Sequence, residues 1–164
     1  MTRRLAAATA VVAAAATAAT LGSTGAPSTA GAQQTSPRTF SLASPFGSGH
    51  SARLETGRRG FSPGDEFFTT GAKLVDPASG RRVGATDGME IVVGRAGQGT
   101  VALTGTLRLA DGRIHMQGLI RHSDRRQQLP VVGGTSAYEG ASGTVTVRED
   151  VRAKRNIMEV RLLH

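Results

Sequence analysis

Apolar and polar residues alternate along most of the second half of the chain. In residues 100–110, TVALTGTLRLA, the positions Val101, Leu103, Leu107 and Leu109 share one face, and Gly105 falls on that same face. Residues 112–120, 143–149 and 157–162 repeat this two-residue period. Because side chains alternate between the two faces of a strand, short segments with this period predict antiparallel strands.

Turn signals separate the alternating segments at short intervals. They are SPGD at 62–65, DPASG at 76–80, Asp87-Gly88, GQG at 97–99 and Asp111-Gly112. No segment after residue 32 has the length and periodicity of a helix, so the pattern predicts an all-β domain, either a two-sheet sandwich or a closed barrel. Gly105 and Gly118 lie on the inner faces of predicted strands and favour the barrel, since glycine suits the strong coiling at barrel corners.

The N-terminal segment differs from the rest. Arg3-Arg4 precede an Ala- and Val-rich run, and Ala30-Gly31-Ala32 has the small-x-small form that signal peptidase reads. We expect residues 1–32 to be a signal peptide cleaved near Ala32, so that the protein is secreted, outside the cell or into the envelope, with no integral membrane segment after processing. A membrane anchor is the alternative, although the run is only marginally hydrophobic. General secretion and twin-arginine export both remain open as routes.

The mature chain divides into two predicted parts. Residues 33–49 are rich in Ser, Gly, Pro and Gln and read as a flexible linker that leads into a first strand near Thr39 to Leu42. Residues 50–164 form the predicted barrel domain.

Composition narrows the possible partners. The formal net charge is +8, but the basic residues form short groups near turns, acidic residues are interspersed, and aromatic residues make up only 4% of the chain. A nucleic-acid partner is therefore excluded, because such surfaces combine a continuous basic patch with stacking aromatics. Cysteine is absent, which excludes disulfides and thiolate metal sites. Weak attraction to anionic cell-surface polymers fits the charge.

Four ordered segments carry a family resemblance: GDEFFTTGAKLVD, GRRVGATDG, GRIHMQGLI and LPVVGGTSAYEGASGTVTV. In this order and spacing the chain resembles the allene oxide cyclase and dirigent-protein superfamily from about Gly64 to Leu163. The most specific part is the run from Gly133 to Gly143, GGTSAYEGASG. We expect a turn at Gly133-Gly134, a second turn at 140–143, and Tyr138 packed over the barrel end between them.

The resemblance implies an eight-stranded antiparallel β-barrel with a small apolar cavity at one end, often assembled as a trimer in plants. It also implies either ring closure of an unstable fatty-acid epoxide or stereoselective coupling of phenoxy radicals. Neither activity requires a metal or an organic cofactor, so we expect no cofactor. Both hold a flexible, reactive, apolar molecule in one shape, which lowers the entropic part of the barrier.

Glu90 is the candidate catalytic residue. In DGMEIVVG it alternates with Met89, Ile91 and Val93, and the resemblance points this position into the cavity, where cyclases carry a cysteine. A carboxylate in an apolar cavity suits proton transfer or the steering of a developing cation. A one-residue slip in register would instead place Glu90 on the outer face. The inner-face residues expected to bind the substrate are Thr70, Val92, Leu103, Leu107, Met116 and Ile120.

Other polar positions carry weaker signals. Asp65 is expected to cap backbone amides of a turn. His115 and His122 have no third partner, so no metal site is predicted. Arg121, His122 and Arg125 are candidates for a cavity rim that meets an anionic group of the substrate. If Glu90 faces inward, Met89, Ile91 and Val93 face outward, which indicates a homo-oligomer, a dimer or a trimer.

Departures from the family limit the transfer of activity. The glutamate and asparagine pair that plant cyclases carry on the first strand is missing from RTFSLASPF, and Ile120 replaces a family tyrosine. We therefore expect the scaffold to be shared and allene oxide cyclase activity to be absent. The leading hypothesis is a secreted barrel that guides cyclisation or coupling of a hydrophobic small molecule. The alternatives are a non-catalytic carrier of such a ligand and an envelope-associated structural protein.

Overall fold

The computed structural model describes residues 37–57, 61–95 and 99–163, and every regular element within them is a β-strand. The nine strands are β1 (Arg38–Pro45), β2 (His50–Leu54), β3 (Glu66–Val75), β4 (Arg82–Val92), β5 (Thr100–Leu109), β6 (Gly112–Arg121), β7 (Arg126–Ser136), β8 (Gly143–Asp150) and β9 (Arg155–Leu162). The described segments contain no helix long and apolar enough to cross a membrane. The expected signal peptide, residues 1–32, lies outside the described residues.

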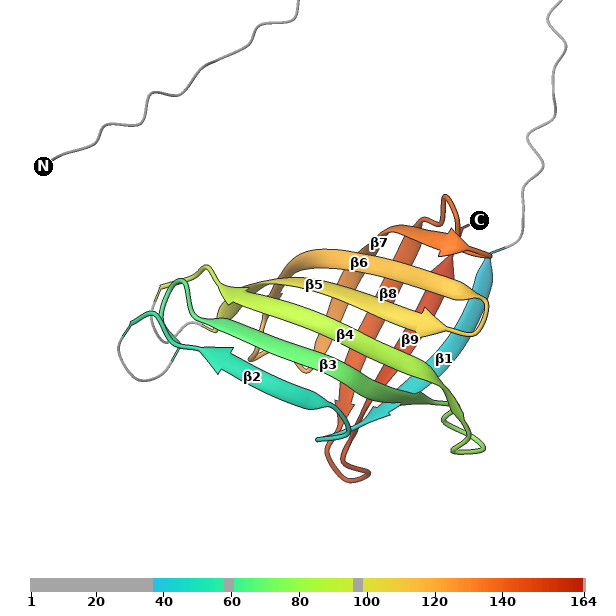
Figure 1. The fold of residues 1–164 in the computed structure, drawn as a ribbon, viewed down its shortest axis with the longest axis horizontal. Coiled ribbons are helices and arrows are strands. Elements are labelled where there is room, and N and C mark those ends of the chain that lie inside the picture. The colour runs from blue at the N-terminus through green and yellow to red at the C-terminus, as the bar shows by residue number, and fades with distance from the viewer. Residues whose placement is uncertain (1–36, 58–60, 96–98, 164) are drawn as a thin grey trace, which may run out of the picture. The chain divides into compact units, whose positions relative to one another are not determined.

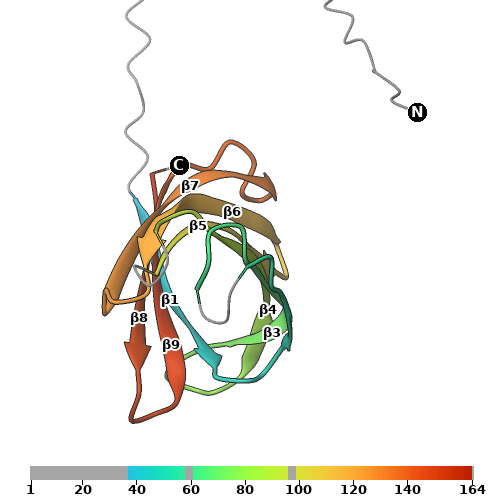
Figure 2. The same ribbon diagram turned by 90° about the vertical axis from the view of Figure 1, so that its left-hand side faces the viewer.

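The strands form one antiparallel sheet in the order β1-β9-β8-β7-β6-β5-β4-β3-β2. An additional pairing between β1 and β3, with Ala43 opposite Val75, closes eight of these strands into a ring. β2 extends the first half of β3 outside this ring, from His50 opposite Thr70 to Leu54 opposite Glu66. Figure 1 shows the barrel from the side, and Figure 2 looks toward one end. The predicted eight-stranded antiparallel barrel is confirmed, and the sandwich alternative is not.

The ring includes a strand that lies before the predicted domain boundary at residue 50. β1 pairs with β9 along its whole length, from Arg38 opposite Leu162 to Pro45 opposite Arg155. The first strand expected near Thr39 to Leu42 is therefore part of the barrel wall. Its pairing on both sides matters physically, because an open edge between β3 and β9 would leave backbone N–H and C=O groups unpaired.

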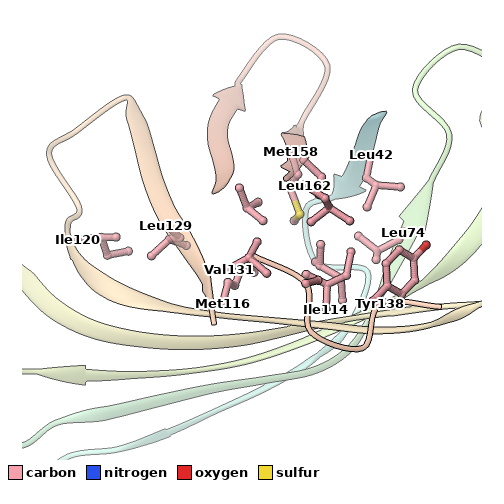
Figure 3. Packing of buried hydrophobic residues seen from close by; sticks show 14 of the residues in the cluster. Leu42, Leu74, Ile114, Met116, Ile120, Leu129, Val131, Tyr138, Met158 and Leu162 are labelled. Carbon is pink, nitrogen blue, oxygen red and sulfur yellow. The ribbon is translucent and has the colours of Figure 1, made fainter. Parts of the chain in front are cut away.

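Side chains fill one end of the barrel. The fully buried residues there come from strands all around the ring and include Leu74, Leu107, Ile114, Val145 and Val160. In Figure 3 Tyr138, Leu74 and Ile114 lie at one end of the buried cluster, and Ile120 and Leu129 lie at the other. The alternation seen in the sequence thus produces an apolar plug, which closes one end of the barrel.

The glycine-rich run 133–143 corrects two turn predictions. Gly133 and Gly134 lie within β7, which continues to Ser136, and the one turn of the run occupies residues 137–140 rather than 140–143, since β8 begins at Gly143. A Cβ on Gly134 would overlap the backbone carbonyl of Tyr138 and lie 2.6 Å from that of Arg113. The glycine is therefore required because the turn after β7 brings Tyr138 back against it and because the carbonyl of Arg113 approaches from β6. Tyr138 is 3% exposed and packs into the plug, as expected.

Candidate functional site

The other end of the barrel holds a cavity of about 550 Å³, a size typical of small-molecule sites. The apolar part of its lining consists mainly of Leu103, Met116, Ile120, Leu129, Val147 and Met158, with Phe61 and Phe67 beside them. The polar part includes residues 122–125, which connect β6 to β7. Because a connection between strands lies at the barrel end, these residues mark the cavity entrance, and Figure 2 faces this end of the barrel.

Four of the predicted site residues line the cavity: Glu90, Leu103, Met116 and Ile120. Val92 and Leu107 are buried in the core, with 1% and 0% of their surface exposed, and they do not line the cavity. Leu107 packs in the plug at the other end of the barrel.

Thr70 is a correction, because it is exposed and does not line the cavity. The pairing of β3 with β4 shifts between Thr69 and Ala72, where the chain inserts an extra residue. Gly71 adopts a φ of +66° at this β-bulge, and its N–H donates to Asp87 Oδ1 at 2.8 Å. A bulge reverses the alternation of side chains along a strand. Thr69 consequently occupies the inward position that the pattern assigned to Thr70.

Glu90 points into the barrel and meets His122. In the sheet register Glu90 lies opposite Phe67 of β3 and Leu103 of β5, both of which line the cavity. Its Oε2 lies 3.1 Å from Nε2 of His122, and the two side chains remain 27% and 38% exposed. The sequence predicted a carboxylate surrounded by apolar groups, whereas the structure shows a partly exposed carboxylate within 3.1 Å of an imidazole nitrogen. Such a pair can accept, hold and return a proton.

His122 was identified in the sequence only as a candidate rim residue. It follows the last residue of β6, so strand alternation says nothing about its direction, and 32 residues separate it from Glu90. A signal was nevertheless present, since a turn after β6 must close over the same barrel end as the last residues of β4. Across residues 37–57, 61–95 and 99–163, no group of three or more His, Asp or Glu side chains is arranged to hold a metal ion.

An aromatic row borders the Glu90–His122 pair. The ring of Phe61 lies 5.0 Å from the imidazole of His122 and 5.3 Å from the ring of Phe67, measured between centroids. The guanidinium of Arg53 lies 4.9 Å from the centroid of Phe67. These residues come from β2, β3 and the two connections at the entrance, so the entrance is lined by flat aromatic surfaces.

Asp65 holds Phe61 in place through the backbone around it. The Asp65 carboxylate is fully buried and accepts hydrogen bonds from the N–H groups of Thr56 at 2.9 Å and Ser62 at 3.0 Å, and from Arg53. The N–H donors of Ser62 and Thr56, followed by Arg53, lower the pKa of Asp65 from 3.8 to about 2 despite its burial. The sequence prediction of a carboxylate that caps backbone amides matches this geometry.

The lowered pKa of Asp65 predicts acid sensitivity. Because the folded-state value lies below the unfolded one, the ionised carboxylate stabilises the protein above about pH 4, and this contribution is lost as the pH falls toward 2. Urea unfolding of wild type and of Asp65→Asn across this range measures the effect. We expect the free energy of unfolding to fall more steeply with acid in the wild type. Parallel curves for the two proteins would contradict the assignment.

Gly88 offers a direct test of the cavity. It lies on the cavity wall, its backbone has no positive φ, and a Cβ placed there would meet nothing closer than 3.7 Å. Gly88→Leu is therefore expected to fold and to fill part of the cavity, weakening binding of an apolar probe at least about tenfold. Gly88→Ala is the matched control and should bind nearly as wild type. Equal affinity of the leucine variant would show that the ligand binds elsewhere.

The fold and site together define a class: a small closed β-barrel with one plugged end and a cavity with apolar and polar walls at the other. The chain belongs to the family described as the allene oxide cyclase barrel like domain, whose model matches residues 55–162. The resemblance found in the sequence is thereby confirmed. No curated protein sequence matches the chain.

Several solved structures share the fold. A pyocyanin demethylase superposes with a TM-score of 0.65 at 20% identity, covering 76% of this chain and 99% of that one. An exo-specific intermolecular Diels-Alderase superposes with a TM-score of 0.60 at 18% identity, covering 78% of this chain and 98% of that one. A pterocarpan synthase dirigent protein superposes with a TM-score of 0.57 at 13% identity, covering 77% of this chain and 92% of that one. At these identities the similarity establishes the barrel, while the activity has to be inferred from the site.

Proposed function

We propose that this protein binds a reactive hydrophobic small molecule in its barrel cavity and guides its cyclisation or stereoselective coupling. The observation that carries the proposal is the Glu90–His122 pair, with 3.1 Å between Oε2 and Nε2, at the entrance of a cavity whose walls combine apolar and polar side chains. Two of the structural neighbours, a Diels-Alderase and a pterocarpan synthase dirigent protein, are named for activities of this kind, whereas a third is named as a demethylase.

The chemistry follows from the position of each group. The apolar walls fix the conformation of a flexible substrate, which removes much of the entropic cost of ring closure. Glu90 accepts a proton from the substrate or stabilises a developing positive charge, and His122 orients the carboxylate through its ring nitrogen. Each of these steps uses only side chains of this chain.

A non-catalytic carrier is the second candidate, since a cavity of this kind also sequesters ligands. To separate the two, the mature protein is titrated with a neutral apolar fluorophore such as Nile red and then incubated with conjugated dienes and with oxidised phenols. Saturable binding with product formation above the spontaneous rate supports the proposal. Saturable binding without product in any assay supports the carrier.

The proposal also includes secretion. If residues 1–32 are a signal peptide, the protein recovered from the culture medium or the envelope starts near Gln33. N-terminal sequencing of the recovered protein measures this directly, and an intact Met1 in a cytoplasmic fraction would contradict it. An envelope-associated structural role instead predicts retention by the envelope and release by moderate salt, because such attraction is screened.

Self-association is a further part of the proposal. Three apolar residues face outward on neighbouring parts of the barrel: Ile91 on β4, Val93 just after β4, and Leu119 on β6. The side chain of Leu119 is 70% exposed. Apolar residues gathered on an outer face favour a dimer or a trimer. Light scattering of the mature protein, compared with a Leu119→Lys variant, tests this; a monomer in both cases would contradict it.

A further inference from the structure

The charge of the cavity lining is opposite to that of the chain. The chain carries a formal net charge of +8. The ionisable residues of the lining are nevertheless mainly acidic: Asp87, Glu90, Asp124 and Glu149 against Arg53 and Arg125, with His122 beside them. A strongly cationic protein that places carboxylates around its cavity disfavours anionic ligands there.

The positive charge of Arg53 is compensated next to the cavity. Its guanidinium forms ion pairs with Glu55 at 3.0 Å and with Asp65 at 3.3 Å. The charge of Asp87 is matched in turn by Arg108 at 2.6 Å. Of the remaining lining carboxylates, Glu90 and Glu149 face the cavity from β4 and β8, on opposite sides of the eight-stranded ring. Asp124 lies next to the oppositely charged Arg125 in the connection between β6 and β7. Within the described segments Glu149 forms no ion pair.

The aromatic row provides surfaces suited to a flat cation. Arg53 already places its guanidinium 4.9 Å from the centroid of Phe67, so a cation lies over a ring of this row. Phe61, which is 38% exposed, lines the cavity beside Phe67 and His122. A positive charge over an aromatic face is stabilised by the electron-rich face of the ring, and a flat ligand ring adds stacking contact.

We propose that the preferred ligands of this cavity are planar conjugated molecules that carry a positive charge. The ring system stacks on Phe61 at the entrance, and the charge lies between the carboxylates of Glu90 and Glu149. The same arrangement rejects carboxylates such as fatty-acid derivatives. This inference rests on the proposed function, since it requires that the cavity binds a small molecule.

Matched dyes test the inference by fluorescence titration at mildly alkaline pH and low salt. Three of them are planar and fluorescent: N-methylacridinium is cationic, acridine is neutral and anthracene-9-carboxylate is anionic. The fourth, adamantyltrimethylammonium, is cationic but not planar, and its binding is measured by displacement of a bound fluorescent dye. We expect N-methylacridinium to bind at least about tenfold more tightly than the anionic dye, which corresponds to about 1.4 kcal/mol.

Two variants identify the groups responsible. Glu149→Gln should weaken the binding of N-methylacridinium about threefold to tenfold and leave the affinity for acridine unchanged, because only the charge interaction is removed. Phe61→Leu should weaken the binding of both planar dyes and leave the affinity for the adamantyl cation unchanged. Glu139→Gln, an equal charge change in the exposed turn beyond β7, is the control and should alter neither.

The outcomes separate this inference from the function on which it rests. If neutral acridine or Nile red binds but the anion binds as tightly as the cation, the inference is wrong and the proposed function stands. If no dye of any charge binds to the folded protein, the proposed function fails as well. If the adamantyl cation binds as tightly as N-methylacridinium, the requirement for a planar ligand is overturned.

Discussion

Replacing Glu90 with glutamine is expected to lower kcat about 10²-fold to 10⁴-fold and to leave the affinity for a neutral ligand nearly unchanged. Glutamine keeps the shape of the side chain and can still contact His122, but it has no carboxylate to accept a proton or to face a developing cation. The apolar walls that bind the ligand, among them Leu103 and Met116, are untouched. A loss in kcat without a loss in affinity identifies a group that acts in the transition state.

The matched control for this variant is Glu139→Gln, which makes the same chemical change in an exposed turn at a distance from the cavity lining. It should have wild-type kcat and KM. If Glu90→Gln turned over substrate at the wild-type rate, Glu90 would have no catalytic role. If kcat were unchanged but affinity fell sharply, Glu90 would be a binding residue only.

The second large effect is expected for Gly134→Ala, which should destabilise the protein by about 3 kcal/mol. The new Cβ would overlap the carbonyl of Tyr138 and crowd that of Arg113. Both obstacles are backbone atoms, which cannot move away as a flexible side chain can. Relieving the overlap would displace Tyr138 from the plug, so packing is lost along with the local geometry.

Chemical denaturation of Gly134→Ala against Gly88→Ala measures this effect. Gly88 lies in a strand with open space around its Cβ position, so its alanine variant should change the free energy of unfolding by less than about 1 kcal/mol. Similar stability of the two variants would show that the chain segments around Gly134 can separate at little cost.

Much of the fold could be predicted because the barrel depends on local patterns. The two-residue period of β5, β6, β8 and β9 indicated which face of each strand is buried. The inward direction of Glu90 came from the family resemblance, because alternation alone left its face open. The glycine-rich run identified the family but misled about the turn. Gly134 is required by the turn that brings back Tyr138 and by the approach of Arg113 from β6, and strand alternation reports neither contact.

The candidate site was harder to predict because its parts meet through connections rather than strands. His122 and Phe61 both lie in segments between strands, where alternation does not apply. Thr70 was assigned inward by a regular alternation that the bulge at Gly71 interrupts. Asp65, by contrast, sits in a Pro-Gly-Asp turn whose chemistry is local, and its capping role was predictable for that reason.

The stereochemistry of product formation tests the central claim most directly. A conjugated substrate that closes or couples spontaneously without selectivity is incubated with wild type, with Glu90→Gln and without protein, and the products are separated by chiral chromatography. If the cavity guides the reaction, wild type yields one stereoisomer in excess at a rate above the background, and Gly88→Leu reduces that excess. A mixture of stereoisomers formed at the spontaneous rate, while Nile red still binds in the cavity, would contradict the account and leave a carrier.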